Sequence, residues 1–275
     1  MLHHYVLALS VLENGDLVSG SADNTIKIWD TSNGTVKQTL TGHTGRINDL
    51  KVVDNNFIIS ASEDSTIRIW NLIDSTLNKT LTGHAGLVMN LALLPNGDLA
   101  SASAVKTIKI WNINDGTVKR TLTGHTNAIW SLVVLNNGDL ASGSNDKTII
   151  IWDVDVGTIK RTLTGHSSQV FRLIILENGD LVSSSRDTTI KIWNTEDGTV
   201  KRTLTGHTCH VLALKELNNG DLVSGSSDGT IKIWNMEDRS LKKSITVNSS
   251  TFSFELLENG DLVSGCVDGT IKVWE

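Results

Sequence analysis

The ten residues Gly116-Thr117-Val118-Lys119-Arg120-Thr121-Leu122-Thr123-Gly124-His125 recur unchanged at positions 198–207, 82 residues further along the chain. A tryptophan precedes each copy by five residues, and a third tryptophan lies midway between those two. The whole series is Trp29, Trp70, Trp111, Trp152, Trp193, Trp234 and Trp274, spaced by 41 residues five times and by 40 once. Such regularity indicates duplication of one unit of about 41 residues, and this period predicts a solenoid, a propeller or an array.

Each unit contains four short runs rich in Val, Ile, Leu and Thr, separated by turn residues, which is typical of β-strands. In the fourth unit these runs are 128–135, 140–144, 148–152 and 158–163. An Asn-Gly turn such as Asn137-Gly138 joins the first two runs in six units, and in the second unit Asn56 is expected to supply the positive φ instead of glycine. Helical periodicity is absent. The sequence therefore predicts an all-β, seven-bladed β-propeller of four-stranded antiparallel blades.

Composition narrows the functional classes. The chain has 275 residues, 39% of them hydrophobic, which excludes disorder as the main state. A net charge of −6 makes nucleic acid an unlikely partner, and no apolar stretch is long enough to span a membrane. Two cysteines and no export signal indicate a reducing compartment, so we expect a cytoplasmic or nuclear protein that is not secreted. The spacing of His, Cys and acidic residues predicts no metal site, and no cofactor is expected.

The Gly-His pairs at 42–43, 83–84, 124–125, 165–166 and 206–207, together with the closing Trp-Asp or Trp-Asn, resemble the WD-repeat β-propellers. The resemblance covers the whole chain as a single domain, 1–275. It implies a rigid, non-catalytic platform that binds a protein or peptide partner on its top face. The repeats are expected at 1–30, 42–71, 83–112, 124–153, 165–194, 206–235 and 247–275.

A histidine, a serine and an aspartate accompany the tryptophan in four units. The sets are His43, Ser60, Asp64 and Trp70; His125, Ser142, Asp146 and Trp152; His166, Ser183, Asp187 and Trp193; and His207, Ser224, Asp228 and Trp234. A Ser-His-Asp group can activate a nucleophile. The resemblance instead implies a buried structural hydrogen-bond chain, and we favour that interpretation because buried indole and imidazole groups need partners.

Three units depart from this pattern. The third has Val105 at the aspartate position, the first has Leu2 at the histidine position and the seventh has Asn248 there. Because an incomplete network leaves a polar group without a partner, blades 1, 3 and 7 are expected to be less stable than the others.

The resemblance also points to three top-face positions per unit: the third and fifth residues after the Gly-His histidine, and the residue before the aspartate. Placing the seventh unit requires a one-residue deletion. The predicted partner-binding residues are Tyr5, Arg46, Leu87, Met89, Trp130, Phe171, Arg186, His210, Leu212 and Phe252. Apolar anchors ringed by polar groups suit a peptide hot spot, and Arg46 and Arg186 suit an acidic group on the ligand. The alternative is that these side chains merely plug the channel.

The predicted fourth strands are basic. They carry Lys37, Lys79, Lys119, Arg120, Lys160, Arg161, Lys201, Arg202, Lys242 and Lys243. We favour protection of an exposed sheet edge, since lysines discourage edge-to-edge pairing. Binding of an anionic partner through this outer rim is an alternative, as is a role as the sensor segment of a larger multidomain protein.

The unit pattern contains six fourth strands, beginning at Thr35, Thr76, Thr117, Thr158, Thr199 and Ser240. The seventh blade is therefore predicted to have three strands. Its edge at 270–274 is apolar with a single lysine, so we expect either pairing with another molecule or a chain that is part of a longer protein.

Overall fold

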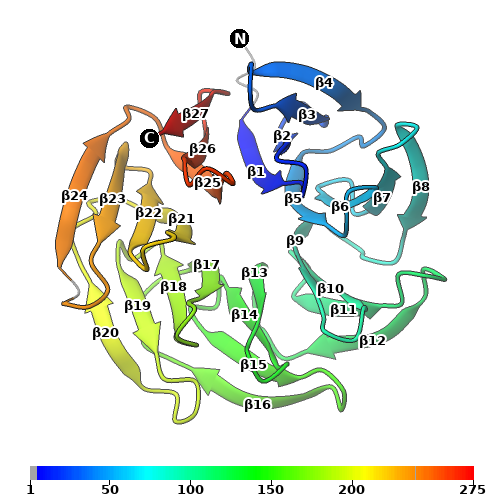
Figure 1. Ribbon diagram of the computed structural model, residues 1–275. Coiled ribbons are helices and arrows are strands. Elements are labelled where there is room, and N and C mark those ends of the chain that lie inside the picture. Colours follow the sequence, from blue (N-terminus) through cyan, green and yellow to red (C-terminus); the bar gives the residue numbers. More distant parts are fainter. Residues whose placement is uncertain (1–4, 239) are drawn as a thin grey trace.

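The computed structural model describes residues 5–238 and 240–275, and within these ranges all regular structure is β-strand. The strands form seven separate sheets arranged around a central axis, as Figure 1 shows. Six sheets have four strands and one has three. The predicted seven-bladed propeller with an incomplete seventh blade is thus confirmed.

Within each blade the strands follow chain order from the central channel to the rim. Blades 1 to 4 comprise β1 (Val6–Val11), β2 (Leu17–Ser21), β3 (Ile26–Asp30), β4 (Thr35–Leu40); β5 (Ile47–Val52), β6 (Phe57–Ser62), β7 (Ile67–Asn71), β8 (Thr76–Leu81); β9 (Val88–Leu93), β10 (Leu99–Ser103), β11 (Thr107–Trp111), β12 (Val118–Thr123); and β13 (Ile129–Val134), β14 (Leu140–Ser144), β15 (Ile149–Asp153), β16 (Thr158–Leu163). Blades 5 to 7 comprise β17 (Val170–Ile175), β18 (Leu181–Ser185), β19 (Ile190–Trp193), β20 (Val200–Leu204); β21 (Val211–Glu216), β22 (Leu222–Ser226), β23 (Thr230–Trp234), β24 (Leu241–Thr246); and β25 (Thr251–Leu256), β26 (Leu262–Cys266), β27 (Ile271–Trp274).

The core lies between the blades. Side chains of blade 3, including Ile108 and Leu122, pack against Ile129, Leu132 and Trp152 of blade 4, and all five are buried. The second strand of each blade is covered on both faces, so β10 and β14 are buried at every residue. Burial of apolar surface from two blades at each interface is the main favourable term that holds such a ring together.

Two kinds of turn shape each blade. The Asn-Gly turn between the first and second strands places glycine at positive φ, as at Gly138 (φ 86°), and the asparagine side chain accepts a bond from the following aspartate amide. The expectation for Asn56 is wrong: this residue has no positive φ, because Asp54 closes the turn by accepting bonds from the Asn56 and Phe57 amides.

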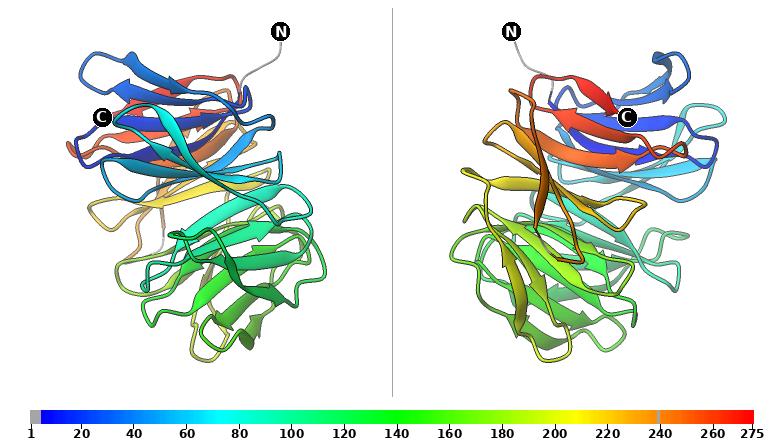
Figure 2. Two further views of the ribbon diagram at one scale, coloured as in Figure 1. Left: turned by 90° about the vertical axis from the view of Figure 1, so that its right-hand side faces the viewer. Right: turned by 60° about the vertical axis from the view of Figure 1, so that its left-hand side comes forward.

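Blades 7 and 1 meet at a seam that differs from the other interfaces. The last strands lie beside the first blade in both views of Figure 2. The buried cluster at this seam consists of Val6, Leu9, Leu17 and Val263, fewer residues than at any other blade interface. Trp29 is partly exposed there, whereas its counterparts Trp70 and Trp152 are buried.

Candidate functional site

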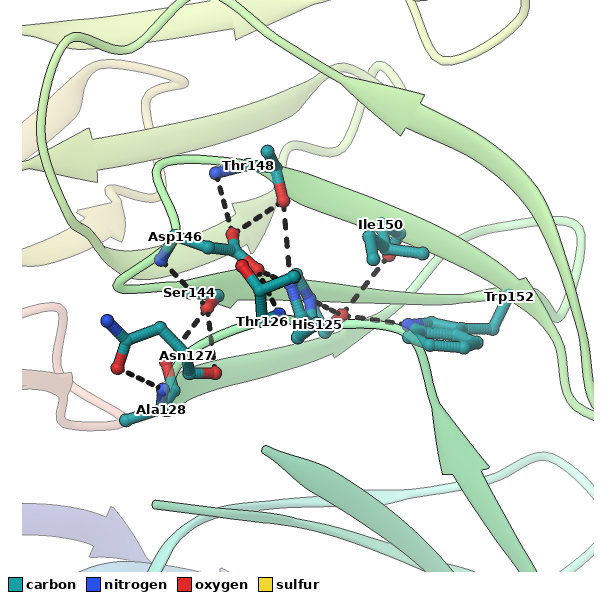
Figure 3. Close-up of polar contacts among 10 residues, drawn as sticks. His125, Thr126, Asn127, Ala128, Ser144, Asp146, Thr148, Ile150 and Trp152 are labelled. Atoms are coloured by element: carbon teal, nitrogen blue, oxygen red, sulfur yellow. Dashed lines mark hydrogen bonds and ion pairs between the residues drawn. The ribbon is translucent and has the colours of Figure 1, made fainter. Parts of the chain in front are cut away.

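The histidine quartets form continuous hydrogen-bond chains. In blade 4, His125 Nδ1 lies 2.7 Å from Asp146 Oδ2, and its Nε2 lies 2.7 Å from Ser142 Oγ. The Trp152 indole donates to the same Ser142 hydroxyl at 2.8 Å, as Figure 3 shows for the whole group. The three other complete quartets, in blades 2, 5 and 6, repeat this geometry with distances of 2.6–2.8 Å.

A second set of contacts holds the aspartate in place. Asp146 also accepts bonds from the Thr126 amide and from both the amide and hydroxyl of Thr148. In blade 2, burial raises the pKa of the Asp64 carboxyl, but hydrogen bonds from Thr66, His43 and Thr44 outweigh that effect and lower the pKa to about 2. The same balance lowers the pKa of Asp228 to about 2. These aspartates are therefore anionic around neutral pH.

The burial of these groups decides their chemical role. The serine of each complete quartet is 0% exposed, and the histidine side chains are 0–1% exposed. Burial also lowers the pKa of His43 and His207, although their aspartate partners oppose the shift. A nucleophile must reach its substrate, and these hydroxyl groups cannot. The geometry supports the structural interpretation of the Ser-His-Asp groups.

Blade 3 has an incomplete network. His84 Nε2 bonds Ser101 at 2.6 Å and Trp111 donates to the same serine at 2.7 Å, but Val105 provides no acceptor. His84 Nδ1 is buried without a partner. Burial and the nearby Lys109 charge lower the pKa of His84 to about 4.

Blades 1 and 7 lack the histidine among the described residues. Their Trp-to-Ser bonds persist, from Trp29 to Ser19 at 2.8 Å and from Trp274 to Ser264 at 2.9 Å. Leu2, expected at the histidine position of the first unit, lies outside the described residues. The start of the repeat expected at 1–30 lies outside them as well.

Two of the three predicted top-face positions are joined by one backbone bond in every blade. The residue before the aspartate position donates its amide to the carbonyl of the third residue after the histidine position, at 2.8–3.0 Å: Ala22 to Tyr5, Glu63 to Arg46, Ala104 to Leu87, Asn145 to Ala128, Arg186 to Gln169, Ser227 to His210 and Val267 to Ser250. The bond in blade 7 agrees with the placement of the one-residue deletion. These positions therefore recur at equivalent places around the top face, which carries the Gly-His loops.

One side chain per blade surrounds the channel entrance at the fifth position after the histidine position. This channel ring consists of Leu7, Asn48, Met89, Trp130, Phe171, Leu212 and Phe252. Together with Gln169, Arg172, Arg186 and His210, it lines a hollow of about 410 Å³. Met89 is buried at 9% exposure, while the other ring members are partly exposed.

Aromatic contacts join two neighbouring members of the channel ring. The rings of Trp130 and Phe171 meet edge to face, with centroids 5.7 Å apart, and Phe171 approaches His210 at 6.1 Å. The Trp130 indole donates to Asn145 Oδ1, which fixes the orientation of the indole ring. Exposed Arg186 lines the same hollow. This quarter of the face therefore combines apolar surface with positive charge.

Three predicted partner-binding residues lie outside that hollow. Tyr5 packs at 6.4 Å from Phe252, and the Arg46 guanidinium stands 5.8 Å from the Tyr5 ring. Arg46 also approaches Glu63 at 3.8 Å, so a partner would have to compete with this carboxylate. The Leu87 side chain is 38% exposed and does not line the hollow.

Arg172 was not predicted as a site residue. It lies one position after the channel ring, where the other six blades have the smaller residues Ala8, Asp49, Asn90, Ser131, Ala213 and Ser253. It lines both the top-face hollow and a second cavity further along the channel. Its signal in the sequence was a long cationic side chain at a position otherwise occupied by small residues.

The basic rim is largely neutralised. Lys160 lies 2.6 Å from Asp139, and equivalent pairs at 2.5–2.7 Å link Lys37 to Asp16, Lys119 to Asp98, Lys201 to Asp180 and Lys242 to Asp221. Other rim cations cap turns of the next blade: Arg120 donates to the carbonyls of Asp155 and Val156, and Arg161 to that of Asp197. These contacts weigh against a free cationic surface for an anionic partner.

The family model described as WD domain, G-beta repeat matches residues 2–30, 34–71, 75–112, 116–153, 157–194, 198–235 and 243–275. The chain belongs to the WD-repeat family. Propellers of this family generally mediate protein–protein interactions and are typically non-catalytic. A crystal structure of the WD40 β-propeller domain of Doa1 is 30% identical, with a TM-score of 0.88 over 100% of this chain and 94% of that one.

Curated relatives match this WD-repeat chain over short segments only. Ribosome assembly protein 4 of Chaetomium thermophilum is 56% identical over 36 residues, covering 13% of this chain and 7% of the relative. Pre-mRNA-splicing factor PRP46 of Candida albicans is 50% identical over 44 residues, covering 16% and 11%. Nuclear distribution protein PAC1 of Scheffersomyces stipitis is 49% identical over 53 residues, covering 17% and 10%. The matched segments thus span about a tenth of these relatives.

Within residues 5–238 and 240–275, no three His, Cys, Asp or Glu side chains gather in a way that could hold a metal ion. The same part of the chain contains no helix long and apolar enough to cross a membrane.

Proposed function

We propose that this WD-repeat propeller binds an extended peptide segment of a partner protein over the channel entrance, with an apolar side chain packed against Trp130 and Phe171. The hollow at the channel ring carries this proposal. Partly exposed aromatic side chains in a concave site are the groups that most often dominate the free energy of protein binding.

Charge adds a preference for the partner. Arg186 and Arg172 line the hollow beside the aromatic pair, and none of the described residues that line it is acidic. A carboxylate next to the apolar anchor would gain charge-assisted hydrogen bonds from a guanidinium. The preferred peptide therefore combines an apolar or aromatic residue with an adjacent Asp or Glu.

The proposal applies equally to a free-standing platform and to a recognition segment within a larger protein. A cytoplasmic or nuclear setting forms part of it. The names of the curated relatives, which concern ribosome assembly, pre-mRNA splicing and nuclear distribution, support that setting.

A phage-displayed library of random peptides, selected on the purified chain, tests the proposal directly. Selected peptides should share the apolar-plus-acidic pattern. Trp130→Ala combined with Phe171→Ala should weaken binding of a selected peptide about thirtyfold, equivalent to about 2 kcal/mol, while the melting temperature changes little.

The control variant carries Lys160→Ala and Arg161→Ala on the rim and should bind as the wild type does. Loss of binding in the rim variant but not in the aromatic variant would favour the anionic-partner alternative. If the aromatic variant unfolds, these side chains are a channel plug and the proposal fails.

A further inference from the structure

In the part of the chain that the structure describes, blade 7 has an open outer edge. Its described residues form three strands, and β27 is the outermost, whereas the other blades end in a rim strand, as Figure 1 shows. Val273 of β27 is 56% exposed, while the equivalent Ile28, Ile110 and Ile151 are 3–4% exposed. An exposed strand presents unpaired backbone N–H and C=O groups to any chain that can align with it.

A groove accompanies this edge. It has a volume of about 750 Å³ and runs along the seam between blades 7 and 1. Its apolar walls include Leu17, Trp29, Val263, Ile271 and Val273. In the closed blades the corresponding space holds a buried leucine of the rim strand, such as Leu122 or Leu163, each 1% exposed.

The groove also has an acidic end at Asp261. In five closed blades the equivalent aspartate binds a rim lysine three residues before a leucine that is buried or, in blade 6, an isoleucine that is partly buried. Blade 2 lacks both partners, since Phe57 and Asn78 occupy these positions. Blade 7 retains the acid: the Asp261 side chain bonds Asn259 of its own turn, and the described residues give it no ion pair.

The pairing register of the closed blades defines what would fit. In blade 4, Ile149 faces Leu163 and Trp152 faces Ile159, with a bulge that releases Lys160 from the ladder toward Asp139. Transferred to blade 7, the leucine of an incoming strand faces Ile271, its first apolar residue faces Trp274 and its lysine reaches Asp261. Lys272 would donate a hydrogen bond to the threonine that precedes the leucine of the incoming strand, as Lys191 donates to Thr203 at 2.9 Å in blade 5.

We propose that the edge of blade 7 binds an extended segment of another polypeptide as a fourth strand. The segment has an apolar residue, then a Lys or Arg, and a Leu three residues after that cation. Backbone bonds to β27 supply part of the affinity, and the leucine and the cation supply the selectivity.

A second copy of this chain fits the groove less well. Its six rim strands are already paired within their own blades. Its free edge, Ile271–Trp274, has a lysine but no leucine three residues later. Charge complementarity with Asp261 and the apolar groove therefore favour a separate strand with the Val-Lys-Arg-Thr-Leu type of sequence.

A fluorescein-labelled peptide with the sequence of residues 116–123 (GTVKRTLT) is the probe, titrated against the whole chain by fluorescence anisotropy. We expect saturable binding and slowed hydrogen exchange of the amides at 271–274. A peptide carrying Lys119→Glu should bind at least about fivefold more weakly, and one carrying Leu122→Asp should not bind.

A charge exchange supplies the decisive comparison. The protein variant Asp261→Lys should bind the natural peptide sequence more weakly and the Lys119→Glu peptide more strongly than the wild type does. Circular dichroism and the affinity for a top-face peptide verify that this variant is folded. The top-face variant Trp130→Ala with Phe171→Ala should bind the rim-strand peptide as the wild type does, which separates this proposal from the preceding one.

Three results would overturn the proposal: equal binding of both peptide charges, absence of binding, or protection of amides away from β27. Light scattering tests the second copy as occupant. A dimer that Val273→Asp dissociates would assign the edge to self-association instead.

Discussion

Blades 3 and 4 are neighbours built on the same four-stranded plan, yet blade 4 has a complete polar network and blade 3 does not. Trp111 and Trp152 donate to Ser101 and Ser142 at 2.7 and 2.8 Å, so one half of the network is the same. The other half differs: His125 meets Asp146, while His84 Nδ1 is buried without a partner.

The turns that contain Val105 in blade 3 and Asp146 in blade 4 nonetheless have the same backbone conformation. Lys106 and Lys147 both adopt a left-handed conformation, at φ 69° and 75°. Ser103 accepts the Val105 amide at 3.3 Å, much as Ser144 accepts the Asp146 amide at 3.1 Å. The carboxylate is therefore dispensable for the shape of a blade. Its contribution should therefore be to the free energy of unfolding.

Asp146→Val makes blade 4 resemble blade 3 and should have the largest effect. The change removes the acceptor of His125, of the Thr126 amide and of both Thr148 donors. We expect a loss of about 3–4 kcal/mol in unfolding free energy, because several partly buried donors lose their partner together. Urea unfolding followed by tryptophan fluorescence measures it. Asp146→Asn, which keeps one acceptor oxygen, should lose less, and a loss below about 1 kcal/mol for the valine variant would contradict the comparison.

Acidic pH should lower the free energy of unfolding through protonation of His84 in blade 3. The pKa of His84 is about 4 in the folded chain, below its ordinary value of 6.5. The unfolded chain therefore binds the proton first, so stability is fully present above pH 6.5 and falls as the pH drops toward 4, by about 2 kcal/mol at pH 5. Unfolding of the wild type and of His84→Gln, compared at pH 7 and pH 5, isolates this contribution. Parallel losses in both proteins would show that His84 is not its source.

Val105→Asp makes blade 3 resemble blade 4. The new carboxylate should accept the bond from His84 Nδ1, which stabilises the fold by about 1 kcal/mol at pH 7 and raises the pKa of His84. An NMR titration of the His84 ring and urea unfolding measure the two effects. Val105→Asn, which lacks the charge, should raise the pKa less. An unchanged pKa for the aspartate variant would mean that the carboxylate does not reach the ring.

The rim should not distinguish the two blades. Lys119 pairs with Asp98 in blade 3 and Lys160 with Asp139 in blade 4, and both lysine side chains are nearly half exposed. Replacing either lysine with methionine should lower the melting temperature by about 1 °C, equally in the two blades. Thermal unfolding followed by circular dichroism checks this. A much larger effect in one blade would show that the blades differ in more than the histidine network.

Much of the fold was predictable because the repeat fixes both period and register. Seven tryptophans gave the number of blades, and the Gly-His pairs located the histidine networks. The missing fourth strand followed from counting units. Even the one-residue deletion in the seventh unit was placed where the Val267-to-Ser250 bond agrees with it.

The remaining features depend on three-dimensional detail that a repeat pattern does not encode. Pairing of Lys160 with Asp139 requires a bulge in the rim strand, and no single residue in the sequence predicts that bulge. Asn56 does not take the positive φ of the glycine in the other turns, because the Asp54 side chain accepts the Asn56 amide and closes the turn in another way. The equivalent positions of Trp130 and Phe171 in neighbouring units placed both at the channel entrance, but the repeat pattern did not separate Leu87 from the hollow or bring Arg172 into it.

Each Gly-His loop follows the rim strand of one blade, but its histidine forms hydrogen bonds within the next blade. His125 comes after β12 of blade 3 and bonds Ser142 of blade 4, and a Cβ on Gly124 would stand only 3.0 Å from Trp152. The histidine thus precedes, along the chain, every other member of the network that it completes. During translation His125 therefore leaves the ribosome before the strands of blade 4 to which it bonds. Once Trp152 emerges, every member of the blade 4 network has been synthesised, so this network can form before blade 5 is made.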